Sequence, residues 1–137
     1  MNIKKWLHKN ASSLHEKRVV ITGATGGLGK ELCFYLAHLN ASITLACRNE
    51  TLALKLKEQI LEKYPNSNID FVQLDLASIQ SVNKCIETLK HYNGIDVLIH
   101  NAGVYNVPVK KLETGYNNIF QIYHRFFLTL IHNIKAL

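Results

Sequence analysis

Residues 18–29 decide the fold, and they read Arg18-Val19-Val20-Ile21-Thr22-Gly23-Ala24-Thr25-Gly26-Gly27-Leu28-Gly29. The short β-branched run from Val19 to Thr22 predicts a buried strand. The strand ends at Gly23, and an apolar pattern with helical spacing resumes at Leu28. The stretch therefore predicts a strand, a glycine-rich elbow and a helix in direct succession.

A glycine-rich elbow between a strand and a helix is a device for binding phosphate groups. Gly23 and Gly27 allow the backbone to turn tightly and allow a pyrophosphate to approach without a Cβ in the way, whereas Gly29 allows the helix to pack close to the strand. The helix N-terminus adds free N–H groups and a partial positive charge. A glycine-rich turn without a ligand is the alternative, and the segments that follow decide between the two.

The rest of the chain alternates between strand and helix patterns. Asn40 ends the first helix, Asn49 and Ser78 are plausible N-caps of the next two, and the second helix must end before Pro65. Further strands are predicted at Ser42–Cys47, Ile69–Leu74 and Ile95–Ile99, and the third helix closes at Asn93-Gly94. This alternation predicts an α/β protein with right-handed crossovers. We expect a truncated, Rossmann-like, doubly wound parallel sheet of about four strands in the order 3-2-1-4, with the first two helices on one face and the last two on the other.

The length of 137 residues allows one domain with a real core. We expect a polar lead-in at residues 1–16, with weak surface adhesion by Trp6 as the alternative, and a partial NAD(P)-binding domain at residues 17–137. The net charge of +6 is spread over many positions. No basic cluster with interleaved aromatic residues is present, so the sequence predicts no nucleic-acid partner.

The cysteines and histidines indicate neither disulfides nor a metal centre. Cys33, Cys47 and Cys85 are odd in number and lie in apolar periodic segments, which is typical of buried free thiols in a reducing compartment. We therefore expect a cytoplasmic protein. The seven histidines include no His-x-x-x-His pair, so no metal site is predicted. No apolar run has the length of a signal peptide or a transmembrane segment.

At this point the sequence resembles the short-chain dehydrogenase/reductase family. The elbow from Thr22 to Gly29 matches that family's Thr-Gly-x-x-x-Gly-x-Gly, Leu74-Asp75-Leu76 follows the third strand, and Asn101-Ala102-Gly103 follows the fourth. His100 stands where the family has a first asparagine, a departure that we interpret as minor because the second asparagine does the positioning. The resemblance implies an oxidoreductase whose cofactor is bound by Thr22, Gly23, Thr25, Gly26, Gly27, Leu28, Gly29, Arg48, Asn49, Asp75, Leu76, Asn101, Ala102 and Gly103.

The end of the second strand narrows the choice between NAD and NADP as the cofactor. An acidic residue at this place binds the adenosine ribose 2′-hydroxyl of NAD, whereas a nearby arginine accommodates the 2′-phosphate of NADP. Here Cys47 takes the acidic position and Arg48 follows it, so NADP(H) is the predicted cofactor. The segment Ala46–Asn49 also resembles the retinol-dehydrogenase-like and WW-domain-oxidoreductase-like branches. Asp75 is expected either to contact the adenine or to cap the following turn, since both roles use the same carboxylate.

The family's catalytic residues are absent from this sequence. The family uses a serine after a fifth strand and a Tyr-x-x-x-Lys motif, yet none of the six tyrosines has a lysine four residues on. The family's asparagine after Ile122 is replaced by Tyr123, as if one or two residues were missing there. Residues 119–137 could alternatively form a genuine long buried helix. His124 is the only nearby candidate base, although a surface or core role is commoner for a lone histidine.

Three functions fit these observations. The first is an NADP-dependent oxidoreductase present as its cofactor-binding half and inactive alone, with a carbonyl or alcohol substrate only in a full-length form. The second is a non-catalytic module that binds NADP(H) or dimerises, with self-association through the terminal helix, whose partners are missing. The third is a truncated product without function.

Overall fold

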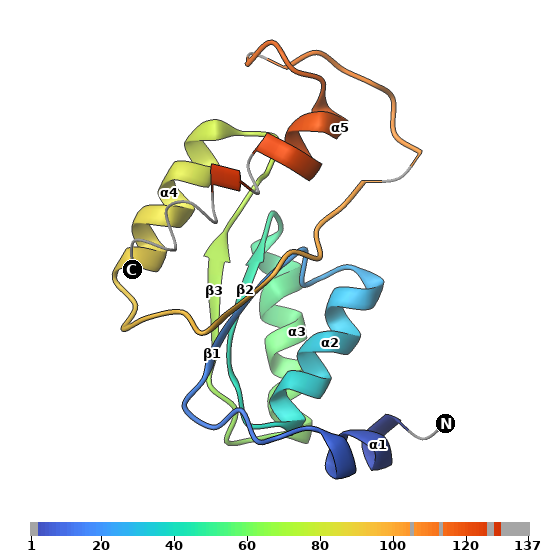
Figure 1. Ribbon diagram of the computed structural model, residues 1–137, viewed down its shortest axis with the longest axis vertical. Helices are drawn as coiled ribbons and strands as arrows, with labels where there is room; N and C mark the ends of the chain where they lie inside the picture. Colours follow the sequence, from blue (N-terminus) through green and yellow to red (C-terminus); the bar gives the residue numbers. More distant parts are fainter. Residues whose placement is uncertain (1–2, 105, 113, 126–127, 130–137) are drawn as a thin grey trace.

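The computed structural model describes residues 3–104, 106–112, 114–125 and 128–129. Four parallel strands form one sheet in the order β3-β2-β1-β4, as predicted. Figure 1 labels β3, β2 and β1 of this sheet. The elements in chain order are α1 Ile3–Asn10, β1 Arg18–Thr22, α2 Gly27–His38, β2 Ser42–Cys47, α3 Glu50–Lys63, β3 Ile69–Gln73, α4 Ile79–Lys90, β4 Val97–Ile99, α5 Asn118–Phe120 and a π-helical turn, η1, Gln121–Arg125.

Helices cover both faces of the sheet because the strands are apolar on both faces. Val19 and Ile21 of β1 point to the cluster that contains the buried residues of α2 and α3, whereas Val20 points to the cluster of α4. This alternation follows from the two-residue repeat of a strand. Ile122 of η1 packs partly buried against the α4 cluster. The predicted division of the helices between the two faces is therefore confirmed for the described residues.

Some boundaries differ from the prediction. β4 begins at Val97 rather than at Ile95, because Asp96 caps the start of β1: its Oδ2 accepts the Arg18 N–H at 2.8 Å and its Oδ1 pairs with Lys17 Nζ at 2.8 Å. β3 ends at Gln73. Part of the expected polar lead-in is helical, as α1. The long helix considered for residues 119–137 is represented by α5 and η1, and most of the remainder lies outside the described residues.

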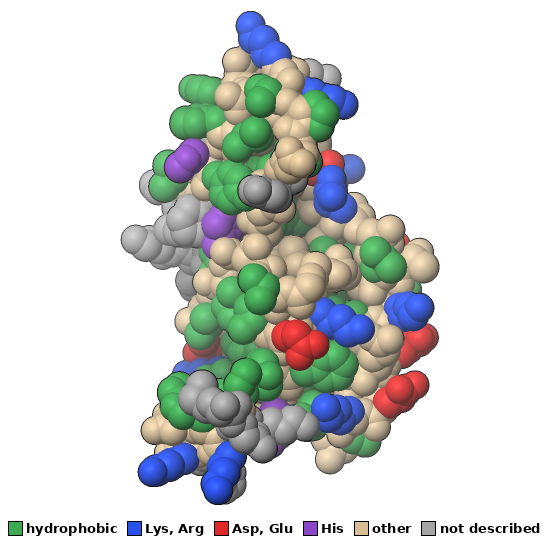
Figure 2. Space-filling model, turned by 90° about the vertical axis from the view of Figure 1, so that its right-hand side faces the viewer, with side chains coloured by type: hydrophobic (Ala, Val, Ile, Leu, Met, Phe, Trp, Pro, Cys, Tyr) green, Lys and Arg blue, Asp and Glu red, His purple; other side chains and the backbone are tan. Residues whose placement is uncertain are grey.

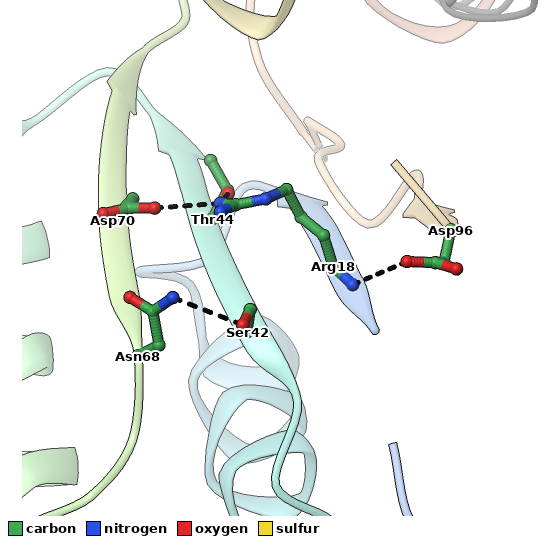
Figure 3. A network of polar contacts seen from close by, with 6 residues as sticks. All are labelled: Arg18, Ser42, Thr44, Asn68, Asp70 and Asp96. Atoms are coloured by element: carbon green, nitrogen blue, oxygen red, sulfur yellow. Dashed lines mark hydrogen bonds and ion pairs between the residues drawn. The ribbon is translucent and has the colours of Figure 1, made fainter. Parts of the chain in front are cut away.

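Arg18 ties β1, β2 and β3 together on the α4 face of the sheet. Its side chain crosses β2, so that Nη1 donates to Thr44 Oγ1 at 3.2 Å and to Asp70 Oδ2 of β3 at 2.8 Å (Figure 3). The Tyr92 ring lies 4.2 Å from the guanidinium carbon and covers it. Thr44 is completely buried, so its hydroxyl depends on a protein partner. The network fixes the amino-terminal half of the sheet, opposite the glycine elbow.

Candidate cofactor site

A cavity of about 640 Å³ opens at the carboxyl ends of the strands. In a parallel α/β sheet this edge is where ligands bind, beside the point at which the strand order reverses. The residues predicted to bind a cofactor all line this cavity except Thr22, which is buried behind it. Sequence reasoning missed five lining residues, namely Cys47, Leu52, Leu74, Val104 and Ile122.

Three glycines of the elbow have different structural reasons for lacking a side chain. Gly23 has φ +64°, and a Cβ there would lie 2.7 Å from the Ala102 Cα. At Gly29 a Cβ would overlap the Gly23 carbonyl oxygen and lie 2.8 Å from Asn101 Nδ2. A Cβ at Gly27 would meet no described atom within 4 Å. Gly23 and Gly29 are thus required by the fold, whereas the space beside Gly27 belongs to the cavity.

The N-terminus of α2 opens into the cavity without a side-chain cap. The helices α3 and α4 are capped by Asn49, whose Oδ1 accepts the Leu52 N–H at 2.9 Å, and by Ser78, whose Oγ accepts the Ser81 N–H at 3.3 Å. At α2 the capping position is Gly26, which has no side-chain oxygen to offer. The first-turn N–H groups and the positive end of the helix dipole therefore face the cavity and suit an anionic group.

Thr22 and Asn101 hold the elbow against the chain that follows β4. Thr22 Oγ1 accepts the N–H groups of Asn101 at 3.2 Å and Ala102 at 3.0 Å. In return, Asn101 Nδ2 donates to the Thr22 carbonyl at 3.2 Å and to the Gly23 carbonyl at 3.1 Å. We call these four hydrogen bonds the elbow clasp. Thr22 and Asn101 thus shape the floor of the cavity, with the Thr22 side chain buried and outside its lining.

His100 belongs to the surroundings of the elbow clasp. Its Nδ1 lies 3.4 Å from Thr22 Oγ1, the oxygen that accepts both N–H groups. Burial lowers the pKa of His100 below its ordinary value of 6.5. Because the Thr22 oxygen already accepts two N–H groups, the Thr22 hydroxyl is the group left to donate in its contact with His100 Nδ1. The histidine that we interpreted from sequence as a minor departure therefore contacts a residue that shapes the site.

The ends of β2 and β3 place one cation and one carboxylate on the cavity wall. Arg48 is exposed, and its carbonyl oxygen accepts a hydrogen bond from Gln73 Nε2 at 2.8 Å. In the described part of the chain no carboxylate pairs with its guanidinium. Asp75 Oδ1 accepts the Ala77 N–H at 2.9 Å, which is the turn-capping role considered from sequence. Burial raises the pKa of the neighbouring Cys47 thiol, so this thiol stays uncharged and does not offset the positive charge of Arg48.

The terminal segment completes the wall beside Gly103. Tyr123 Oη donates to the Val104 carbonyl at 2.7 Å and accepts the Val104 N–H at 3.0 Å, which brings Ile122 to the cavity. His124, the candidate base considered from sequence, does not line the cavity. It lies exposed on the surface with its ring 5.0 Å from that of Phe120. This position fits a surface histidine.

Within the described ranges no three of His, Cys, Asp and Glu gather into a group that could hold a metal ion. No helix among the described residues has the length and apolar character needed to cross a bilayer. The three cysteines are buried and free, as predicted.

Comparison with known proteins gives a consistent result. Residues 17–137 match the family model described as short chain dehydrogenase. The chain is 38% identical over 126 residues to the WW domain-containing oxidoreductase of Drosophila melanogaster, covering 88% of this chain and 31% of that protein. It is 34% identical over 129 residues to retinol dehydrogenase 14 of Mus musculus, covering 85% of this chain and 39% of that protein. These are relatives of the two kinds that the sequence resemblance predicted, and the chain spans only about a third of their length.

A solved structure shows the same fold. L-sorbose reductase of Gluconobacter frateurii, crystallised with NADPH and L-sorbose, superposes with a TM-score of 0.73 at 22% identity. The match covers 90% of this chain and 48% of the reductase. The four strands and their helices therefore correspond to about half of a complete domain of this architecture.

Proposed function

The chain belongs to the short-chain dehydrogenase family of oxidoreductases, and from that premise we propose that residues 17–137 form the part of such an enzyme that binds NADP(H). One observation carries the proposal. A single cavity joins the uncapped N-terminus of α2, the open space beside Gly27, and the cation Arg48 at the end of the neighbouring strand. A dinucleotide with an additional phosphate on its adenosine ribose needs these three features in this order.

The cavity residues fit the cofactor group by group. The glycines from Gly23 to Gly29 would receive the pyrophosphate, and the guanidinium of Arg48 would bind the 2′-phosphate with charge-assisted hydrogen bonds. Leu74 and Leu76 offer apolar contacts for the adenine, with the Asp75 carboxylate between them. NADPH, when bound, supplies a hydride to a carbonyl. The NADPH found in the structure of L-sorbose reductase supports the choice of cofactor.

We propose further that the polypeptide 1–137 does not catalyse turnover by itself. Reduction of a carbonyl requires a proton at the substrate oxygen when the hydride arrives. The family's tyrosine, lysine and serine for this task are not in this sequence. Tyr123 and His124 do not replace them, since the Tyr123 hydroxyl is bonded to the Val104 backbone and His124 lies outside the cavity. A carbonyl or alcohol substrate therefore belongs to a longer form. The free thiols suit a reducing compartment such as the cytoplasm.

The test is a titration of purified 1–137 with NADPH and NADH, followed by the cofactor's fluorescence. We expect Arg48→Ala to weaken the binding of NADPH by about 1.5 kcal/mol, which is roughly tenfold in affinity, and to leave the binding of NADH almost unchanged. This value is the low end of the about 1.5–3 kcal/mol that hydrogen bonds to charged groups contribute, and it applies because Arg48 is exposed. Lys55→Ala is the matched control, since it removes an exposed cation of α3 that does not line the cavity. Equal losses for both cofactors would contradict the assignment of the 2′-phosphate to Arg48.

A dimerising module is the second candidate function, and exposed apolar side chains of the terminal segment favour it. Phe120, Tyr123 and Leu128 are 44%, 39% and 64% exposed. A second copy covering these side chains would give a dimer whose mass is measurable by light scattering. We expect Phe120→Ser to shift such a dimer towards monomer, and a monomeric wild-type protein would exclude this function.

A further inference from the structure

The helix α1 is amphipathic and leaves large apolar side chains in solvent. Ile3, Trp6 and Leu7 share one side of the helix because they are spaced by three and four residues. Ile3 is 44% exposed and Trp6 is 49% exposed, so about half of each of these side chains is left in contact with solvent. Lys5 and Lys9, one turn apart, are also exposed and follow another side of the helix.

The charged side chains of α1 itself are all basic. Residues 1–15 contain Lys4, Lys5 and Lys9, and the first acidic residue of the chain is Glu16. An amphipathic helix with exposed aromatic and aliphatic residues beside lysines fits the boundary between lipid headgroups and acyl chains. A negative lipid surface attracts such lysines by about 1 kcal/mol each.

The fold holds α1 away from the cofactor cavity. The Leu14 N–H donates to the Leu39 carbonyl at 2.7 Å, and the Leu14 side chain packs against the core cluster of α2 and α3. The segment that follows α1 is therefore fixed at the end of α2. Figure 1 places α1 at the end of the molecule opposite the carboxyl ends of β2 and β3, and Figure 2 shows basic side chains gathered with hydrophobic ones at that same end.

We propose that α1 docks the protein on the surface of an anionic phospholipid bilayer. Trp6 and Ile3 enter the interface, and the lysines contact lipid phosphates and carboxylates. The cavity at the opposite end stays open to solvent. A bilayer suits α1 better than a second copy of the chain, because like charges on two copies of α1 would repel each other. The proposal does not depend on NADP(H) binding.

The chain carries its own probe for this docking, because Trp6 is its only tryptophan. The full chain is mixed with phosphatidylcholine vesicles, with and without phosphatidylserine. We expect a blue shift of Trp6 emission and co-sedimentation only with the anionic vesicles, and both should decrease as the ionic strength rises. Absence of the shift, or an equal shift with neutral vesicles, would overturn the proposal.

Charge variants make the test specific to α1. The double variant Lys5→Gln and Lys9→Gln should bind anionic vesicles about 25-fold more weakly, or roughly fivefold for each lysine. The matched control is Lys55→Gln with Lys84→Gln, which removes the same charge from exposed positions of α3 and α4. An equal loss in the control would overturn the proposal in favour of net charge alone. A Trp6 shift with a DNA oligonucleotide but not with vesicles would overturn it in favour of a nucleic acid.

Discussion

Replacing Gly29 by alanine should destabilise the fold at the place where the cofactor site is built. A Cβ on Gly29 would overlap the Gly23 carbonyl oxygen and lie 2.8 Å from Asn101 Nδ2 and 3.0 Å from the Ala24 Cα. Two of these three neighbours are backbone atoms, which cannot rotate away. Overpacking of this kind costs typically about 1–3 kcal/mol. The overlap with backbone atoms places the cost in the upper part of this range, at about 2–3 kcal/mol, and alanine recovers about 1 kcal/mol through its better helix propensity, so we expect a net loss of about 1–2 kcal/mol.

Gly27→Ala is the matched control because it makes the same chemical change two residues earlier in the same helix. Its Cβ would meet no described atom within 4 Å, so the fold should tolerate it. Thermal unfolding followed by circular dichroism should show Gly29→Ala melting about 3–8 °C lower and Gly27→Ala unchanged or slightly higher. In an NADPH titration, by contrast, Gly27→Ala should be the affected variant, because it stays folded but binds the cofactor more weakly. A Gly29→Ala protein as stable as the wild type would refute this account of the elbow.

Two further predictions concern the other face of the sheet and the pH. Arg18→Met should lower the free energy of unfolding by about 1–2 kcal/mol in urea, because Thr44 loses a buried partner and Asp70 loses its ion pair, while Lys17→Met should cost much less. Equal losses of stability from Arg18→Met and Lys17→Met would show that the hydrogen bonds of Arg18 to Thr44 and Asp70 contribute no more than an exposed ion pair. Burial lowers the pKa of His100, so the unfolded chain binds its proton more readily, and stability falls as the pH drops below 6.5. His100→Asn should flatten this decline, and unchanged slopes in unfolding experiments across that range would contradict the prediction.

The sheet and the elbow could be predicted from sequence because local signals determine them. β-branched runs, glycine spacing and the N-caps at Asn49 and Ser78 each act over a few residues, and the structure has them in place. The cavity wall contributed by Val104 and Ile122 could not be predicted in the same way. It depends on hydrogen bonds between the Tyr123 hydroxyl and the backbone of Val104, 19 residues away, and no periodic pattern in the sequence predicts such a contact.

The misses at α1 and His100 have physical causes as well. Eight residues with three lysines form too short a helix for composition to reveal, although Ile3, Trp6 and Leu7 do have helical spacing. The contact of His100 with Thr22 depends on how β1 and β4 pair. Because Ile21 pairs with Ile99, the next residues of the two strands, Thr22 and His100, lie side by side. Strand register, which the sequence did not specify residue by residue, decides this contact.

The elbow clasp also sets the order in which the protein can fold during synthesis. It joins Thr22 to Asn101 across 79 residues, whereas β1 and β2 are linked by one short crossover. Closing the longer loop costs about 1 kcal/mol more in chain entropy. Until residues 97–102 are available, the elbow between β1 and α2 has no partner for the clasp. The proposed cofactor site is therefore incomplete before that point, and binding of a cofactor there can stabilise the fold only afterwards.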